Sequence, residues 1–393
     1  MELCTFAADG GFPEAVLRGQ KLSLLSQDKY EQMKNLTSIK QLKDFLIEET
    51  DFKDFFEGLQ LTTEIDTLQL MGCIKNKLAD ELKYLEGNCI NPCFEFIGFL
   101  RTPYMIDNVV NIINGTKNKT SRHDIEANIN PIGRFDEIDM MLKTDSDDTA
   151  GLWEILFTDC PLSDYILKFF KGKSTGGKER DFKEVDTFFK EIDPQEVGIG
   201  LKKLWIEDFI QFCEDRLNPL SAQGMVHILR QKADFMTIQA VYNTLSREKQ
   251  ERLRLRKDYT PTCGYLYEDG QYKTLCECDS LDMLREKVKH HPTYQTILNG
   301  VPDPTKVKDG DNGRDAQKFD NGGLDQAIFR AEVEDAILVF DEQANYAVFY
   351  AYMILKEQEY RNIGWVASMI GFTVGKNDPR WERIILPMDS KDV

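Results

Sequence analysis

The sequence predicts an all-α protein built from three related helical units. Apolar residues recur at helical spacing over long windows, whereas sustained apolar–polar alternation, which would indicate β-strands, is scarce. Two patterns also recur along the chain at intervals close to one third of its length, which is typical of a fold made of repeats. The main helical windows are residues 64–86, 196–217, 221–245, 324–345 and 340–372.

The first segment, residues 13–58, is predicted to form a helical hairpin. Pro13 stands where the first turn of a helix tolerates proline, and Leu17 follows on the apolar face. Ser26 and Asp28 then provide the start signal of a second short helix.

One recurring pattern occupies residues 30–56, 135–166 and 272–298. Each copy begins with an aromatic residue and an aliphatic residue three positions later. An acidic or hydroxyl capping residue, a short helix, a break and a closing apolar turn follow. The second copy carries an insertion.

The other recurring pattern is a four-residue block that follows a helical stretch. The blocks are Ile106–Val109, Phe235–Ile238 and Tyr360–Ile363. Since both patterns recur in the same order, we expect three related helical units. The predicted units are residues 1–120, 121–250 with a polar insertion at 171–181, and 251–393 with a polar insertion at 299–323.

Residues 340–372 are predicted to form one long helix with a wide buried stripe. Val348, Tyr352 and Leu355 begin that stripe, and Ile363, Val366 and Ile370 continue it. The uninterrupted apolar run ends at Leu355, far short of the about 20 residues that a bilayer span needs. Charged residues in the middle of such a helix usually face solvent, and less often a partner. These residues are Lys356, Glu357, Glu359 and Arg361.

Composition excludes several classes of protein. The formal net charge is −18, from 49 basic and 67 acidic residues, which disfavours nucleic-acid binding because phosphate contacts need a basic face. Nine cysteines without framework spacing disfavour a secreted disulfide scaffold. The first residues lack the basic flank and apolar core of a signal peptide, so we expect a cytosolic or peripheral protein.

Three fragments resemble chemical motifs but lack essential parts. Residues 172–175, Gly-Lys-Ser-Thr, match only the last half of a phosphate loop, because Leu167 stands where its first glycine should be. The acidic run that contains Asp309, Asp311, Asp315 and Asp320 has Arg314 in place of the turn glycine of a calcium loop. These two fragments predict neither nucleotide nor calcium binding.

The third fragment offers zinc ligands at unusual spacing. Cys276 and Cys278 precede the adjacent His290 and His291, which would project in different directions on a helix. The sister copies of this pattern lack such residues, so a metal is not needed for the fold. With no catalytic motif elsewhere, we expect no enzyme activity, no cofactor and no metal.

Four stretches, in order, resemble subunit d of the V-type proton ATPase, a family that also includes the C subunit of the archaeal and bacterial V/A-type ATPases. The resemblance runs from about Gly11 to the ILPM at residues 385–388. The stretches are VLRGQKLSLLSQDKY at 16–30, TPYMIDNVVNIINGT at 102–116, CGYLY at 263–267 and LKEQEYRNIGWVASMI at 355–370.

The resemblance implies a funnel-shaped body of three pseudo-threefold related helical units. It implies a non-catalytic rotor subunit, one copy per complex, on the cytoplasmic face of acidic organelle membranes such as vacuoles and endosomes. It implies contact with the proteolipid ring and the central stalk, with the a subunit of the stator as a further candidate partner. The family's motif positions either line the socket for the stalk or brace helices, and their recurrence by symmetry favours bracing. These positions are Tyr104, Asp107, Asn108, Lys356, Glu357, Glu359, Arg361 and Asn362.

Two other hypotheses stay open at this point. One is a helical adaptor or tether of the same fold that works outside the proton pump. The other is a metal-dependent enzyme that uses Cys276, Cys278, His290 and His291. Co-purification with ring and stalk subunits separates the first from the rotor subunit, and metal analysis tests the second.

Overall fold

The structure is a computed structural model that describes residues 2–56, 67–144, 149–173, 193–268, 270, 272–305 and 323–388. Over these ranges the chain forms α-helices and short 3-10 helices, and it contains no β-strand. The predicted all-α class is therefore confirmed. None of the helices described is long and apolar enough to cross a membrane.

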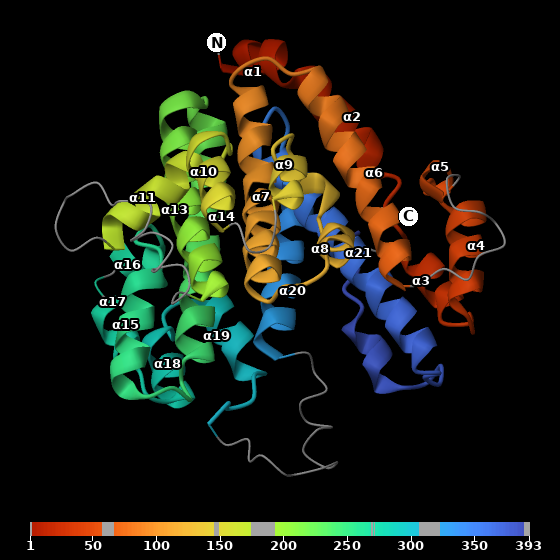
Figure 1. Cartoon of the computed structure of the whole chain (residues 1–393). Coiled ribbons are helices and arrows are strands. Elements are labelled where there is room, and N and C mark those ends of the chain that lie inside the picture. The colour runs from red at the N-terminus through yellow and green to blue at the C-terminus, as the bar shows by residue number, and fades with distance from the viewer. Residues whose placement is uncertain are drawn as a thin grey trace.

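The helices follow one order three times along the chain: three short helices precede a pair of long ones (Figure 1). The first set is α3 (Gln27–Met33), α4 (Ile39–Glu49) and α5 (Lys53–Phe56), then α6 (Thr67–Gly87) and α7 (Cys93–Lys117). The second is α9 (Ile138–Lys143), α10 (Thr149–Thr158) and α11 (Ser163–Lys173), then α13 (Pro194–Arg216) and α14 (Pro219–Asn243). The third is α17 (Tyr272–Cys276), α18 (Leu281–Lys287) and α19 (Pro292–Asn299), then α20 (Gly323–Val339) and α21 (Ala347–Gly371).

The other described helices precede, connect or follow these sets. They are α1 (Glu2–Asp9), α2 (Gly11–Lys21), α8 (Arg122–Ala127), η1 (Pro131–Gly133), α15 (Lys249–Tyr259), α16 (Tyr265–Glu268) and η3 (Pro379–Arg383). The predicted boundary after residue 120 falls between α7 and α8, whereas the one after residue 250 falls inside α15.

Each copy of the longer sequence pattern coincides with the three short helices of its set. The hydroxyl caps predicted there are present in two copies, since Ser38 accepts from the Gln41 backbone at 3.2 Å and Ser280 from Met283 at 3.3 Å. Residues 145–148, where the second copy would place its cap, lie outside the described residues. The predicted insertions at 171–181 and 299–323 also lie largely outside them.

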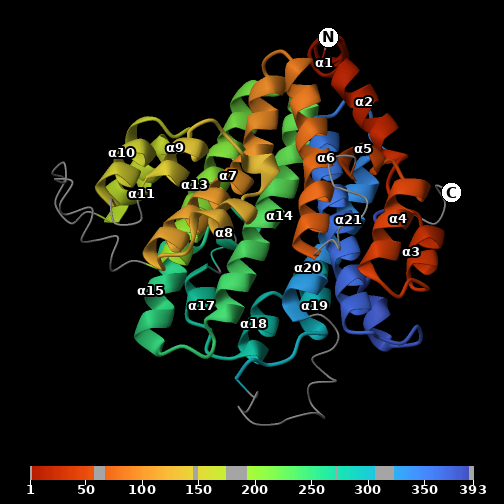
Figure 2. The same cartoon turned by 45° about the vertical axis from the view of Figure 1, so that its right-hand side comes forward.

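The turns that join the long helices of each pair gather at one end of the molecule (Figures 1 and 2). Tyr346, which precedes α21, donates its backbone N–H to Ser221 at the start of α14 at 3.2 Å. Its ring lies 5.3 Å from that of Phe96 on α7 and 5.0 Å from that of Phe6 on α1. Contacts between residues far apart in the sequence therefore hold this end together.

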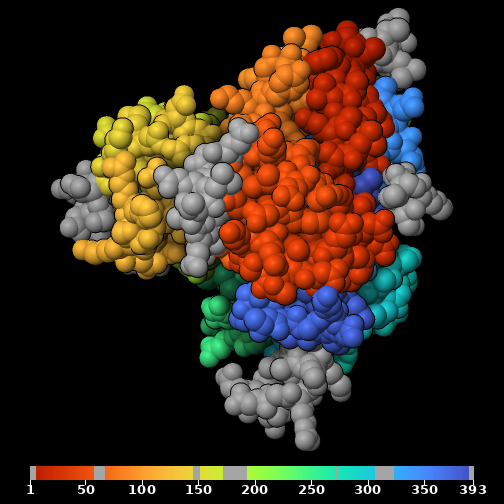
Figure 3. Space-filling view, turned by 90° about the vertical axis from the view of Figure 1, so that its right-hand side faces the viewer, coloured from red at the N-terminus to blue at the C-terminus, as the bar shows by residue number. Residues whose placement is uncertain are grey.

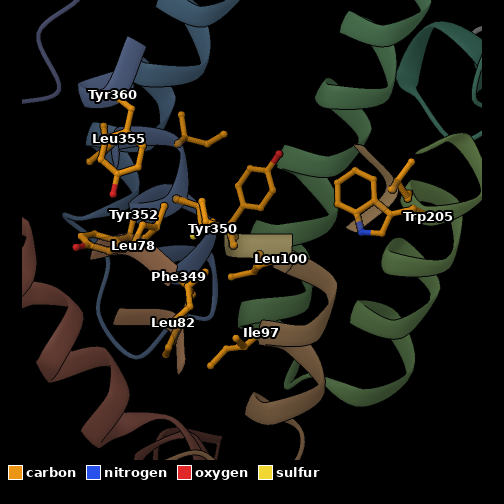
Figure 4. Close-up of a cluster of buried hydrophobic side chains, with 14 of the residues drawn as sticks. Leu78, Leu82, Ile97, Leu100, Trp205, Phe349, Tyr350, Tyr352, Leu355 and Tyr360 are labelled. Atoms are coloured by element: carbon orange, nitrogen blue, oxygen red, sulfur yellow. The ribbon is translucent and has the colours of Figure 1, made fainter. Parts of the chain in front are cut away.

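Helix α21 lies at the centre of the packing. It contacts α2, α4, α6, α7, α14 and α20, and its predicted apolar stripe is buried. Figure 4 shows Phe349, Tyr352 and Leu355 of α21 packed near Leu78 and Leu82 of α6. A helix buried on most of its circumference explains why this stretch carried the clearest sequence signal.

The predicted helix over 340–372 begins seven residues late, at Ala347. Residues before it form a turn in which Ala344 has a φ of 59°. Arg18 of α2 donates to the Phe340 carbonyl at 2.8 Å, and Glu14 accepts from the Ala344 N–H at 3.1 Å. These bonds to α2 replace helical bonds, so the window predicted over 324–345 also ends early, at Val339.

Both helices of the predicted N-terminal hairpin are present, since α2 contains Pro13 and α3 begins directly after Ser26. The stretch over 13–58 is not a simple hairpin, because α4 and the short α5 follow them. In Figure 3 these residues and α6 form one continuous surface on this side of the molecule, and the C-terminal residues show mainly along its lower edge. This N-terminal layer covers one side of α21, which contacts α2 and α4.

Candidate functional site

Asn108 on α7 and Asn362 on α21 make the same pair of hydrogen bonds. Asn108 donates its side-chain amide to the Asn130 carbonyl at 2.9 Å and accepts from the Asn130 N–H at 2.7 Å. Asn362 donates to the Ile385 carbonyl at 2.6 Å and accepts from the Ile385 N–H at 3.3 Å. Both side chains are buried, so each satisfies two backbone groups of the segment that follows its long helix.

In the second set, Asp234 on α14 binds the following segment instead. Its carboxylate accepts from the backbone N–H groups of Tyr265 and Leu266, each at 3.1 Å, and from the Tyr294 hydroxyl at 2.7 Å. Thr237, which stands at the block position of Asn108 and Asn362, bonds only to the Ala233 carbonyl of its own helix, at 3.0 Å. The anchoring side chain has therefore moved back by about one helical turn.

Glycines allow the anchored segments to approach their helices. A Cβ on Gly133 would lie 2.3 Å from the Tyr104 carbonyl carbon, and one on Gly264 would lie 2.1 Å from Asp234 Oδ1. Any larger residue at either place would push the segment away from α7 or α14.

The Asp234 carboxyl makes stability depend on pH in a defined direction. Burial, only partly offset by Tyr294 and the two backbone donors, raises the pKa of Asp234 to about 6. An unfolded aspartate titrates near about 3.9, so the protonated carboxyl favours folding and this contribution is lost as pH rises through about 6. Relative to Asp234→Asn, we expect the wild-type free energy of unfolding to fall by about 2 kcal/mol from about pH 4 to about pH 7. Urea titrations of both proteins across this range measure the difference, and a constant difference would contradict the assignment.

Lys356 and Glu359 form an ion pair in the interior, which corrects the expectation that the charged residues of α21 face solvent. Lys356 Nζ lies 3.0 Å from Glu359 Oε2, and both side chains are 0% exposed. Glu359 also accepts the Leu25 backbone N–H at 2.7 Å. Burial lowers the pKa of Lys356, but the attraction of Glu359 and Glu81 outweighs it, so the net shift is upward.

The buried pair belongs to a larger cluster that includes α6. Glu81 accepts the Tyr352 hydroxyl at 2.7 Å and lies 3.7 Å from Lys77, which pairs with Asp51. Burial raises the pKa of Glu81 although Lys356 and Lys77 oppose that shift. The cluster contains two ammonium groups and three carboxyl groups, and it ties the N-terminal layer and α6 to α21.

The remaining motif residues are half-buried or exposed. The Tyr104 hydroxyl donates to Glu357, whose other oxygen lies 2.9 Å from Arg361 Nη2. Burial, followed by the charge of Glu357, raises the pKa of Tyr104. Asp107 is exposed and pairs with Lys202 of α13 at 2.7 Å. Polar contacts therefore join α7 both to α21 and to α13.

A small cavity of about 20 Å³ lies between α14, α20 and α21, next to an ion pair of Lys232 and Glu332 at 2.5 Å. Its walls include Phe235, Tyr350 and Ile354. A space of this size holds no more than a water molecule or two.

Cys276, Cys278 and His291 of the zinc hypothesis make other contacts. The Cys276 and Cys278 carbonyls accept from the buried guanidinium of Arg256, the first at 2.9 Å, and the His291 ring stacks on Tyr294. Within the part of the chain that the structure describes, no three His, Cys, Asp or Glu side chains are placed to hold a metal ion. Asp309, Asp311, Asp315 and Asp320, and Ser174 and Thr175 of the phosphate-loop fragment, lie outside that part.

Sequence reasoning missed the partners of the motif residues. Lys77 and Glu81 stand on the apolar face of α6 beside Ile74, Leu78 and Leu82, and charged residues at core positions could have indicated a buried cluster. Asn130, Asp234 and Arg256 carried no such signal, since their roles depend on segments distant in the sequence.

Known proteins match nearly the whole length of this chain. The family model described as ATP synthase (C/AC39) subunit matches residues 13–380. The chain is 29% identical over 373 residues to the V-type proton ATPase subunit d of Dictyostelium discoideum, covering 94% of this chain and 93% of that protein. It is 27% identical over 378 residues to V-type proton ATPase subunit d1 of Arabidopsis thaliana, covering 94% of each. It is 26% identical over 375 residues to V-type proton ATPase subunit d of Saccharomyces cerevisiae, covering 94% of this chain and 96% of the relative. A match of this extent shows that the chain belongs to the ATP synthase (C/AC39) subunit family.

Proposed function

We propose that this chain is a non-catalytic subunit of a V-type proton ATPase that couples the central stalk to the proteolipid ring. The observation that carries the proposal is full-length similarity to proteins named V-type proton ATPase subunit d. Coupling needs a stiff body with wide contact surfaces, and long helices tied together by buried polar contacts provide stiffness.

We further propose that the three sets of helices are related by a pseudo-threefold axis and form a funnel. The thrice-repeated helix order supports this arrangement. Burial supports it as well: in each four-residue block the first, third and fourth residues are buried and the second is not. A funnel of this kind would receive the foot of the stalk, while its outer surface would rest on the ring.

The proposed assembly holds one copy of the chain, with the a subunit of the stator as a further candidate neighbour. The chain would lie on the cytoplasmic face of acidic organelle membranes and attach through its partners. The net charge of −18 favours docking against basic surfaces, and added salt would weaken that attraction. In this role the chain would perform no chemistry of its own.

Removal of the chain from cells tests the coupling role. We expect ATP-driven acidification of isolated organelles to be lost although the ATP-hydrolysing head still assembles, because torque would no longer reach the ring. Acidification is followed with a pH-sensitive dye, and head assembly by purification of the ATP-hydrolysing subunits. Restoring the full chain is the control, and normal acidification without the chain would exclude this role.

The alternative of an adaptor outside the pump predicts different partners. A coupling subunit should co-purify with proteolipid and stalk subunits at one copy per assembly. An adaptor would be recovered without them and would leave acidification intact.

A further inference from the structure

Two cysteines lie in direct contact at the end of the molecule where the turns between long helices gather. Cys89 follows α6, and Cys93 is the first residue of α7. Their sulfur atoms are 3.0 Å apart. A disulfide bond is about 2.05 Å long, so a shift of about 1 Å would bring the two sulfurs to bonding distance.

The two thiols differ in access and in acidity. Cys89 is half-buried and can be reached from solvent, whereas Cys93 is buried. The hydrogen bond from Cys93 lowers the pKa of the Cys89 thiol, and the same bond raises the pKa of Cys93. An accessible thiolate beside a protected thiol is the arrangement of an attacking and a resolving cysteine.

We propose that Cys89 and Cys93 form a dithiol modification site that small-molecule disulfides such as oxidised glutathione convert to an intrachain disulfide. Cys89 attacks one sulfur of the oxidant, forms a mixed disulfide and releases one thiolate. Cys93 loses its proton to water and attacks the Cys89 sulfur, which releases the second thiolate. Two protein thiols are thereby oxidised by two electrons, and one disulfide is reduced to two thiols.

The second step is favoured by the first. In the mixed disulfide the Cys89 sulfur no longer carries negative charge, so the hydrogen bond that opposes ionisation of Cys93 is lost. Glu86 near Cys89 works against the lowered pKa of that thiol, although its carboxylate pairs with Arg101, whose Nη1 lies 2.8 Å away.

The consequence of oxidation is local. The disulfide closes a loop of only five residues, so in the chain-entropy view it stabilises the whole chain less than a long-range disulfide would. It fixes the turn that exposes Ile90, which is 59% exposed, and Phe94, which is 51% exposed. Oxidation therefore changes how this end of the molecule presents two apolar side chains. The inference does not depend on the proposed coupling role.

The test uses the full chain, which is first reduced and then incubated in buffers with an increasing ratio of oxidised to reduced glutathione. Free thiols are then alkylated, and the peptides are identified by mass spectrometry. In the wild type we expect the peptide that contains both cysteines to lose two hydrogens and to resist alkylation. In Cys93→Ser we expect glutathione to remain attached to Cys89, because the resolving thiol is absent. In Cys89→Ser we expect no adduct, because Cys93 is buried.

Cys73, which is also half-buried but makes no sulfur–sulfur contact with another of the described cysteines, is the internal control. It should carry at most a simple glutathione adduct, equally in all three proteins. Cys93→Ala, which buries no new hydroxyl, repeats the trapping experiment if Cys93→Ser does not fold by circular dichroism. A persistent glutathione adduct on wild-type Cys89 equal to that of the Cys93 variants, or unmodified thiols throughout, would overturn the proposal.

Discussion

Replacement of Lys356 by Met is expected to lower the free energy of unfolding by about 3–5 kcal/mol, because it leaves the Glu359 carboxylate buried without its cation. Glu359→Gln should cost a similar amount, since it leaves the buried Lys356 ammonium with only the weaker attraction of Glu81 and Asp51. The double variant should lose much less than the sum of the two, because neither charge is then stranded. Urea or guanidinium unfolding of the four proteins measures the cycle.

A matched surface pair provides the control. Arg247 and Glu251 are four positions apart in the sequence and their charged groups lie 2.9 Å apart, but 58% and 41% of their side chains are exposed. Arg247→Met should cost no more than about 1 kcal/mol, because solvent screens both charges. If Lys356→Met were as mild as Arg247→Met, the buried cluster would not hold α21 in place.

Replacement of Asn362 by Ala is expected to cost about 2–4 kcal/mol, because the N–H and C=O groups of Ile385 would lose their partner in the interior. Asn108→Ala should cost a similar amount through Asn130. Thermal or denaturant unfolding measures both losses. Proteolysis should also show that residues after η3 become accessible in Asn362→Ala, since their anchor to α21 is removed.

Asn111 gives a control on the same helix as Asn108. It is exposed and donates to the Asn128 carbonyl at 3.3 Å, so Asn111→Ala should change stability by less than about 0.5 kcal/mol. Equal losses of stability in Asn111→Ala and Asn108→Ala would show that the two buried hydrogen bonds of Asn108 do not stabilise the fold more than an exposed one.

The all-α class could be predicted because apolar residues at helical spacing mark the buried face of each helix. Leu355 and Ile363 mark the buried stripe of α21, and the stripe is visible in the sequence before any contact is known. The recurring patterns also locate parts of each set, since the longer pattern covers its short helices and each four-residue block lies in the second long helix.

The errors come from contacts between residues far apart in the chain. The start of α21 depends on Arg18 and Glu14, which bind the turn before Ala347 from more than 300 residues away. The sequence around Phe340 does not reveal these contacts, because the helical spacing of apolar residues continues through the turn.

The charged residues of α21 illustrate the same difficulty. Periodicity cannot distinguish Lys356, which is buried, from Arg361, which is partly exposed and lies 3.8 Å from the centre of the Phe329 ring. Their surroundings depend on α6 and on the Leu25 backbone in one case and on α20 in the other. Site residues could therefore be named from the resemblance, but whether each faces the core or a surface could not be predicted.

Photo-crosslinking from the two ends of the chain in native membranes tests the coupling role most directly. A photoreactive amino acid at Ile90 reports on the end where the turns gather. A second one at Phe372, which is 76% exposed, reports on the opposite end of α21. A helix of 25 residues such as α21 is about 37 Å long, so the two probes sample well-separated surfaces. We expect mass spectrometry to identify two different neighbours from one proton pump, a ring proteolipid from one position and a stalk subunit from the other. Crosslinks from both positions to the same neighbour, or only to proteins outside the pump, would contradict a coupling subunit.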